Sequence, residues 1–139
     1  MKKIIILIFF STILFCGCEF ALDYDNAIIF LSSRPITKES FDPNIVQNTF
    51  DQGQSIYFCL YSKTPFNANE GRLQILKKDL KTQVYGYSLY QGKDILLNPI
   101  KNCYTDSFTI FSEGYYLLKI FSKNNPNEPL AQTTFWITE

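Results

Sequence analysis

The sequence predicts an all-β domain, either a sandwich or a small barrel, and three observations support this. Apolar and polar residues alternate over short runs such as Ala131–Thr138, which is the period of a strand with one buried face. Gly, Pro, Asn and Asp interrupt these runs at short intervals. Tyr, Phe, Ile, Val and Thr are abundant, and no stretch carries a sustained helical stripe of apolar residues.

About eight strands are expected along the chain. Ser55–Ser62 is apolar on both faces and therefore predicts a central strand. Gln91–Asp94 has the composition of a hairpin turn, which would divide two strands. The other predicted strands are Ala27–Leu31, Arg72–Lys77, Gln83–Tyr90, Ile95–Leu97, Tyr104–Phe111, Gly114–Ser122 and Ala131–Thr138.

The longest irregular segment is predicted over Ser32–Gly53, which contains Pro35 and Pro43. Within it, Ile36 and Thr37 are expected to pair briefly with the edge of a sheet. Loops of this length inside a compact domain are often functional. A plain connection between the first two strands is the favoured interpretation.

The chain begins like a secretory signal peptide. Lys2 and Lys3 precede the apolar run Ile4–Phe15, which is followed by Cys16, Gly17 and Cys18. The run is short for crossing about 30 Å of hydrocarbon. The alternatives are an ordinary cleaved signal and an uncleaved membrane anchor.

The end of this segment resembles the lipobox of bacterial lipoproteins, with the small residue Gly17 directly before Cys18. Phe15 departs from the pattern, because it stands where the family usually carries Leu. The resemblance implies a signal peptide over residues 1–17, a lipidated Cys18 with a short tether over residues 18–25, and one domain over residues 26–139. It also implies an exported chain anchored to a bacterial membrane, with the outer membrane or the cell surface favoured.

The charge balance gives no reason to expect nucleic acid as a partner. The chain has 13 basic and 13 acidic residues, and removal of Lys2 and Lys3 would leave 11 basic residues against the 13 acidic ones. The charge balance likewise gives no reason to expect that a cluster of basic residues binds anionic lipid. Membrane attachment is therefore expected from the acyl chains on Cys18.

Catalytic chemistry is largely missing from the sequence. There is no histidine, which removes the commonest general base and the imidazole metal ligands. Cys59 and Cys103 lie in or beside apolar strand sequence, where thiols are usually inert. We predict no enzymatic activity, no metal site and no cofactor.

The segment Ser112–Leu118, Ser-Glu-Gly-Tyr-Tyr-Leu-Leu, resembles the D-x-G-x-Y-x-C motif of immunoglobulin-type (Ig) domains. Gly114 takes the place of the glycine and Tyr116 that of the corner tyrosine, while Ser112 replaces the usual aspartate and Leu118 the cysteine. The resemblance implies a single Ig-like antiparallel β-sandwich of about seven to eight strands. A small up-and-down barrel is the competing fold.

The Ig-like strand order also bears on Cys59 and Cys103. It makes the strand holding Cys59 and the strand beginning at Tyr104 antiparallel neighbours, so a disulfide is possible. If Cys18 is acylated, the two cysteines are left as an even pair in an exported chain. Cys59 lies in mid-strand and Cys103 at a strand's start, however, and two separate buried thiols are slightly favoured.

Alternation assigns sides to the last two strands. If Tyr116, Leu118 and Ile120 face the core, the residues between them face outward. The last strand then turns Phe135 and Ile137 inward. Together these assignments place four large residues on one exposed sheet face: Tyr115, Leu117, Phe121 and Trp136. That is more apolar surface than a lone monomer usually shows to water, so an unknown protein partner or a second copy of the domain is expected to cover it.

These inferences lead to one expected function and two alternatives. The expected function is a lipid-anchored binding or assembly module of the cell envelope, non-catalytic and acting through protein–protein contacts. The first alternative is a structural subunit of a membrane-associated envelope complex. The weaker one is an Ig-like protease inhibitor acting through the loops Lys63–Gly71 and Lys123–Pro129.

Overall fold

The structure, a computed structural model, describes residues 27–37, 39, 41–79 and 86–139. Signal peptide residues 1–17, Cys18 and the tether to residue 25 lie outside the described residues, as does Asn26. The described elements are β1 (Ala27–Ser32), η1 (Pro43–Ile45), β2 (Thr49–Asp51), β3 (Ser55–Ser62), β4 (Glu70–Lys78), β5 (Tyr87–Leu96), β6 (Cys103–Thr109), β7 (Gly114–Ser122) and β8 (Ala131–Thr138).

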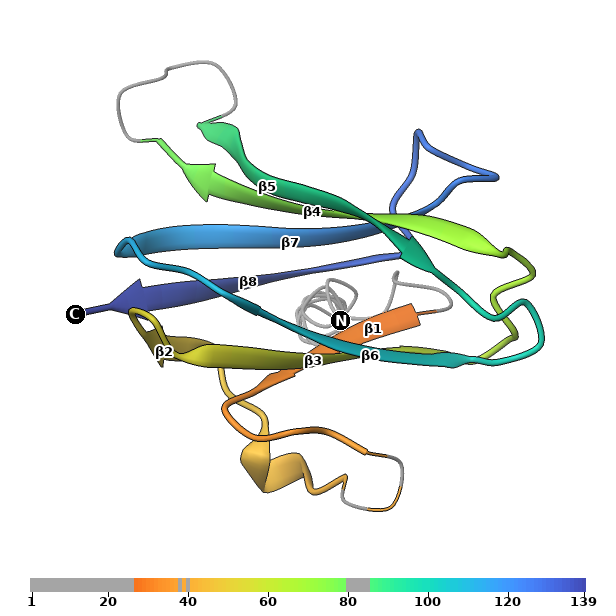
Figure 1. The fold of residues 1–139 in the computed structure, drawn as a ribbon, viewed down its shortest axis with the longest axis horizontal. Helices are drawn as coiled ribbons and strands as arrows, with labels where there is room; N and C mark the ends of the chain where they lie inside the picture. Colours follow the sequence, from red (N-terminus) through yellow and green to blue (C-terminus); the bar gives the residue numbers. More distant parts are fainter. Residues whose placement is uncertain (1–26, 38, 40, 80–85) are drawn as a thin grey trace, which may run out of the picture.

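The strands form two sheets that pack face to face (Figure 1). The smaller sheet has the order β1-β3-β6, and the larger has the order β2-β8-β7-β4-β5. Neighbouring strands are antiparallel except for the short β2, which runs parallel to β8. This is the strand order of an Ig-like sandwich, in which a sheet of the A, B and E strands faces a sheet of the G, F, C and C′ strands. The predicted fold class is confirmed, and the alternative of an up-and-down barrel is wrong.

The core lies between the two sheets and is built from every second residue of the facing strands. In β3 the inward residues are Ile56, Phe58 and Leu60, and in β8 they include Phe135 and Ile137. The largest fully buried side chains are Tyr116, Phe50, Phe58, Phe135, Ile56, Leu60, Leu73, Ile75, Ile110, Leu118, Ile120 and Ile137.

Tyr116 forms the tyrosine corner that the motif predicted. Its side chain is fully buried, and its hydroxyl donates a hydrogen bond to the carbonyl oxygen of Ser112 at 2.8 Å. Gly114 between them has φ +143°, a conformation that strongly favours glycine. The motif residues therefore fix the turn that leads into β7.

The prediction of a hairpin turn at Gln91–Asp94 is wrong, because these residues lie inside the continuous strand β5. Two sets of contacts involve the residues of this strand. β5 pairs with β4 along its whole length, with a register shift between Ile75 and Leu76. Lys93 also reaches across to the other sheet, where its ammonium donates to the carboxylate of Asp106 on β6. Residues 83–85 of the strand predicted before this turn lie outside the described residues.

The described residues of the segment Ser32–Gly53 contain more secondary structure than the sequence predicted. They include η1, whose first turn is capped by the Asp42 side chain, and the short strand β2. Ile36 and Thr37 are not part of a strand, so the expected edge pairing is wrong. Ile36 is buried instead. In the part of the chain that the structure describes, no helix is long and apolar enough to span a bilayer.

Candidate binding surfaces

The outer face of the larger sheet carries the residues that alternation assigned to it. On β7, Tyr116, Leu118 and Ile120 are buried, while Tyr115 and Leu117 are half-buried on the opposite side. On β8, Phe135 and Ile137 are buried, whereas the side chain of Trp136 is 51% exposed. The predicted sides agree with the observed exposure. The role of this face as an interface remains a prediction.

Tyr115 and Trp136 are direct neighbours across the β7–β8 pair. They occupy partner positions in the register, and their ring centroids lie 4.6 Å apart at an angle of 52°. On the other side of Tyr115, the ammonium of Lys78 lies 5.7 Å from the centroid of its ring. A cation over an aromatic face is attracted to it, so this row of side chains is held in place across three strands.

An aliphatic row lies next to this aromatic row. Leu117 pairs with Leu76 on β4, and Leu76 pairs with Leu89 on β5, which is 58% exposed. Sequence reasoning did not include Leu76 and Leu89 in the surface. The sequence did contain the information for Leu76, because on an alternating strand it faces the same side of the sheet as Arg72 and Gln74. We call Tyr115, Trp136, Leu117, Leu76 and Leu89 the apolar cluster.

Phe121 shares this face but lies apart from the apolar cluster. It is six residues from Tyr115 along β7, roughly 20 Å at strand spacing. A polar row of Gln74, Lys119 and Gln132, joined by the register, lies between them. Phe121 pairs instead with Arg72, whose guanidinium donates to Asp94 at 3.0 Å.

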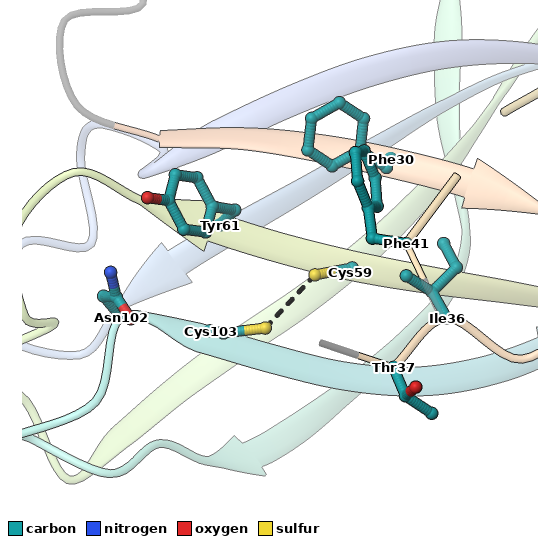
Figure 2. A pocket seen from close by; sticks show the side chains of 8 residues that line it. All are labelled: Phe30, Ile36, Thr37, Phe41, Cys59, Tyr61, Asn102 and Cys103. Atoms are coloured by element: carbon teal, nitrogen blue, oxygen red, sulfur yellow. Dashed lines mark hydrogen bonds between the residues drawn. The ribbon is translucent and has the colours of Figure 1, made fainter. Parts of the chain in front are cut away.

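The outer face of the smaller sheet is covered in part by Ile36 and Phe41, which lie between β1 and η1 in the chain. Ile36 is only 5% exposed there, and the rings of Phe30 and Phe41 lie 4.9 Å apart. Between this cover and the sheet is a pocket of about 310 Å³ (Figure 2). It is lined by Phe30, Ile36, Thr37, Phe41, Cys59, Tyr61, Asn102 and Cys103.

Cys59 and Cys103 point toward each other at the base of this pocket (Figure 2). Both are free thiols in the structure, and their sulfur atoms lie 3.2 Å apart. Burial and the contact with Cys103 raise the pKa of the Cys59 thiol to about 12. Cys59 therefore stays protonated at neutral pH.

The two loops proposed for an inhibitor lie against each other at one end of the sandwich. Phe66 of the first loop is buried in the core. The side-chain amide of Asn124 in the second loop donates to the carbonyl oxygen of Asn67, and Lys123 pairs with Glu70 at 2.7 Å. Residues 123–128 are nevertheless exposed, and this loop projects from the end of the sandwich (Figure 1), so the inhibitor alternative stays a prediction.

No group of three or more His, Cys, Asp or Glu side chains among the described residues is arranged to hold a metal ion. Three carboxylates of the described strands, those of Glu70, Asp94 and Asp106, form ion pairs with lysine or arginine side chains. Cys18, the predicted lipidation site, lies outside the described residues.

No protein-family model matches the chain, and no curated protein sequence matches it. Among solved structures it is similar to the PmoD soluble domain from Methylocystis sp. ATCC 49242 (Rockwell), with 13% identity and a TM-score of 0.49 over 81% of this chain and 90% of that one. It is also similar to an immunoglobulin-like protein from Pseudomonas aeruginosa, with 12% identity and a TM-score of 0.48 over 79% of this chain and 91% of that one.

A β-glucosidase from Kluyveromyces marxianus is a further similar structure, with 14% identity and a TM-score of 0.37. The match covers 80% of this chain and only 14% of the enzyme. All three similarities are weak. The strand order and the tyrosine corner identify the Ig-like fold.

Proposed function

We propose that this chain is a lipid-anchored, non-catalytic binding module of the bacterial cell envelope that holds a protein partner on the outer face of its larger sheet. The observation that carries the proposal is the exposed apolar cluster. Large side chains from four neighbouring strands, β8, β7, β4 and β5, lie together on this face, and Trp136 and Leu89 are each more than half exposed.

The arrangement matches the composition of protein–protein interfaces. Their centres are rich in Tyr and Trp and poor in charged residues, and their rims are polar. Here Tyr115, Trp136 and Leu117 lie at the centre, and the row of Gln74, Lys119 and Gln132 lies on one side. Aromatic residues of this kind contribute most of the binding energy in such contacts.

Charged side chains of both signs surround the apolar cluster. Lys78 and Lys119 lie in the aromatic row and in the polar row, and Asp79, Glu113 and Glu139 line the hollow beside Tyr115 and Trp136. The expected partner is another protein with an apolar patch flanked by charges of both signs.

Photo-crosslinking in intact cells tests this proposal. A photoreactive amino acid at Thr134, an exposed position that pairs with Leu117, is expected to give a single adduct with another envelope protein. The same amino acid at Thr105, exposed on the smaller sheet, is the matched control and is expected to give none. Trp136→Ala is expected to weaken the Thr134 adduct by about tenfold or more, because a hot-spot residue contributes about 2 kcal/mol or more.

The possible outcomes separate the alternatives. An adduct of this chain with itself would identify a homodimer and contradict the proposed partner. An adduct from Thr134 that persists in Trp136→Ala would show that the apolar cluster does not carry the binding. The variant is informative because Trp136 is half exposed, so its loss is expected to leave the fold nearly as stable as before.

A further inference from the structure

The two cysteines of the smaller sheet lie on adjacent strands and on the same face. Cys59 is in the central strand β3, opposite Thr105, and Cys103 begins β6, opposite Tyr61. The register therefore separates them by two residues, which keeps both side chains on one side of the sheet. Diagonal neighbours of this kind lie about 7–8 Å apart along the sheet, and somewhat less between their Cβ atoms. The contact of 3.2 Å between the sulfur atoms follows from this register.

A covalent bond requires a further approach of the two residues. The sulfur atoms of a disulfide lie about 2.05 Å apart and its Cα atoms about 4.4–6.8 Å apart, so the sulfur atoms must close by about 1 Å from 3.2 Å and β3 and β6 must draw slightly together here. We propose that Cys59 and Cys103 form an intramolecular disulfide that ties the central strand of the smaller sheet to its neighbour. The sequence alone slightly favoured two separate thiols, because Cys59 lies in mid-strand and Cys103 at the start of a strand.

The pocket gives an oxidant access to this pair. Cys103 is half-buried and lines the pocket, whereas Cys59 is only 6% exposed. The Cys103 thiolate attacks a small-molecule disulfide, and one thiolate of that oxidant leaves. The Cys59 thiolate then attacks the sulfur of Cys103 in this mixed disulfide, and the second thiolate leaves. Two protein thiols are oxidised, the disulfide of the oxidant is reduced to two thiols, and the two protons pass to the leaving thiolates.

The order of these steps follows from the surroundings of each thiol. Burial raises the pKa of the Cys59 thiol to about 12, so Cys59 is the poorer nucleophile at neutral pH. It therefore reacts second, with the sulfur of Cys103 in the mixed disulfide next to it. The same pocket is open to a reductant as well as to an oxidant. Persistence of the bond in cells therefore requires an oxidising compartment, which is part of the proposed function.

Peptide mapping of the full chain tests the bond directly. The protein is purified without reductant, incubated with glutathione disulfide, alkylated under denaturing conditions and digested with trypsin. We expect residues 39–63, which contain Cys59, to be recovered linked to residues 102–119, which contain Cys103, and the link to disappear after reduction. Recovery of both peptides separately with alkylated cysteines, or a link from either one to Cys16 or Cys18, overturns the proposal.

Thermal unfolding gives a second measurement. Reduction is expected to lower the Tm of the oxidised wild type by about 5–15 °C, since the bond closes a loop with a sequence separation of 44 residues. The Tm of Cys103→Ser is expected not to respond to reductant, and an equal response in that variant contradicts the proposal. Both tests use purified protein, so they do not depend on where the chain resides or on what binds the apolar cluster.

Discussion

The hydroxyl of Tyr116 donates a hydrogen bond to the backbone carbonyl oxygen of Ser112 at 2.8 Å, and the ring of Tyr116 stacks on that of Phe135 with centroids 5.5 Å apart. One side chain thus joins the turn before β7 to the centre of the core. Tyr116→Phe keeps the ring and removes the bond. We expect the free energy of unfolding to fall by about 1–2 kcal/mol in urea denaturation.

The control for this variant is Tyr61→Phe, since Tyr61 is exposed on the smaller sheet. Its change in the free energy of unfolding is expected to stay within about 0.5 kcal/mol. Equal effects of the two substitutions would show that the tyrosine corner contributes nothing beyond the ring.

The parts of the fold that the sequence predicted are those with a strong local signal. β7 and β8 each have one buried face, so alternation identified both their extent and their sides. The motif around Gly114 and Tyr116 identified the fold class, because the corner depends on a few residues close together in the chain. The same alternation placed Trp136 on the outer face.

The errors occur where the signal is weak or comes from distant contacts. Most of β5 is exposed, so it lacks alternation, and its Gln91–Asp94 segment has the composition of a turn. β2 has three residues and is held by its parallel pairing with β8, far along the chain. The closeness of Cys59 and Cys103 depends on the register between β3 and β6, which no local pattern specifies.

The ion pair between Lys93 and Asp106 links the two sheets and predicts a pH dependence. Partial burial raises the pKa of the Asp106 carboxyl. Hydrogen bonds from Lys93, the Ser107 backbone and Tyr104, together with the charge of Lys93, lower this pKa by more than burial raises it. The pKa of Asp106 in the folded state is therefore below its ordinary value. A lowered pKa in the folded state stabilises the fold above the unfolded pKa of about 3.9, and this contribution is lost as the pH falls through the folded pKa.

Asp106→Asn is therefore expected to lower the free energy of unfolding by about 0.5–1 kcal/mol at pH 7, and by progressively less in acid as the pH falls through the lowered pKa of the folded state. Chemical denaturation at pH 7 and at an acidic pH below that pKa measures the difference. The estimate is small because both side chains are about one-third exposed. Arg72 and Asp94 form a more exposed pair on the same edge of the larger sheet, and Asp94→Asn serves as the control with a smaller effect. A cost for Asp106→Asn that is equal at both pH values would contradict the ionic origin.

Gly114 and Gly92 allow a matched pair of substitutions. Gly114 has φ +143°, and a Cβ atom there would lie 2.8 Å from Cε of Lys77. The lysine side chain can move away, so backbone strain is the main cost, and we expect Gly114→Ala to destabilise the fold by about 1–3 kcal/mol. Gly92 lies within β5 at an ordinary φ, and a Cβ atom there would lie 3.2 Å from the flexible end of Arg72 and at an ordinary contact distance, 3.7 Å, from the Leu73 carbonyl oxygen. Gly92→Ala is expected to be nearly neutral in the same denaturation assay, and the reverse order would refute the role assigned to Gly114.

Lipidation at Cys18 is the prediction on which membrane attachment depends. Gly17 and the apolar run Ile4–Phe15 lie directly before it, as in the substrates of lipoprotein processing that the segment resembles. Cys18→Ala removes the thiol that would form the thioether. We expect the variant to accumulate as an unprocessed precursor and to incorporate no labelled fatty acid. Cys16→Ala is the matched control, because it removes the neighbouring thiol and leaves Gly17 and Cys18 in place. Normal labelling of Cys18→Ala, or loss of labelling in Cys16→Ala alone, would place the lipid elsewhere and remove the basis for the anchor.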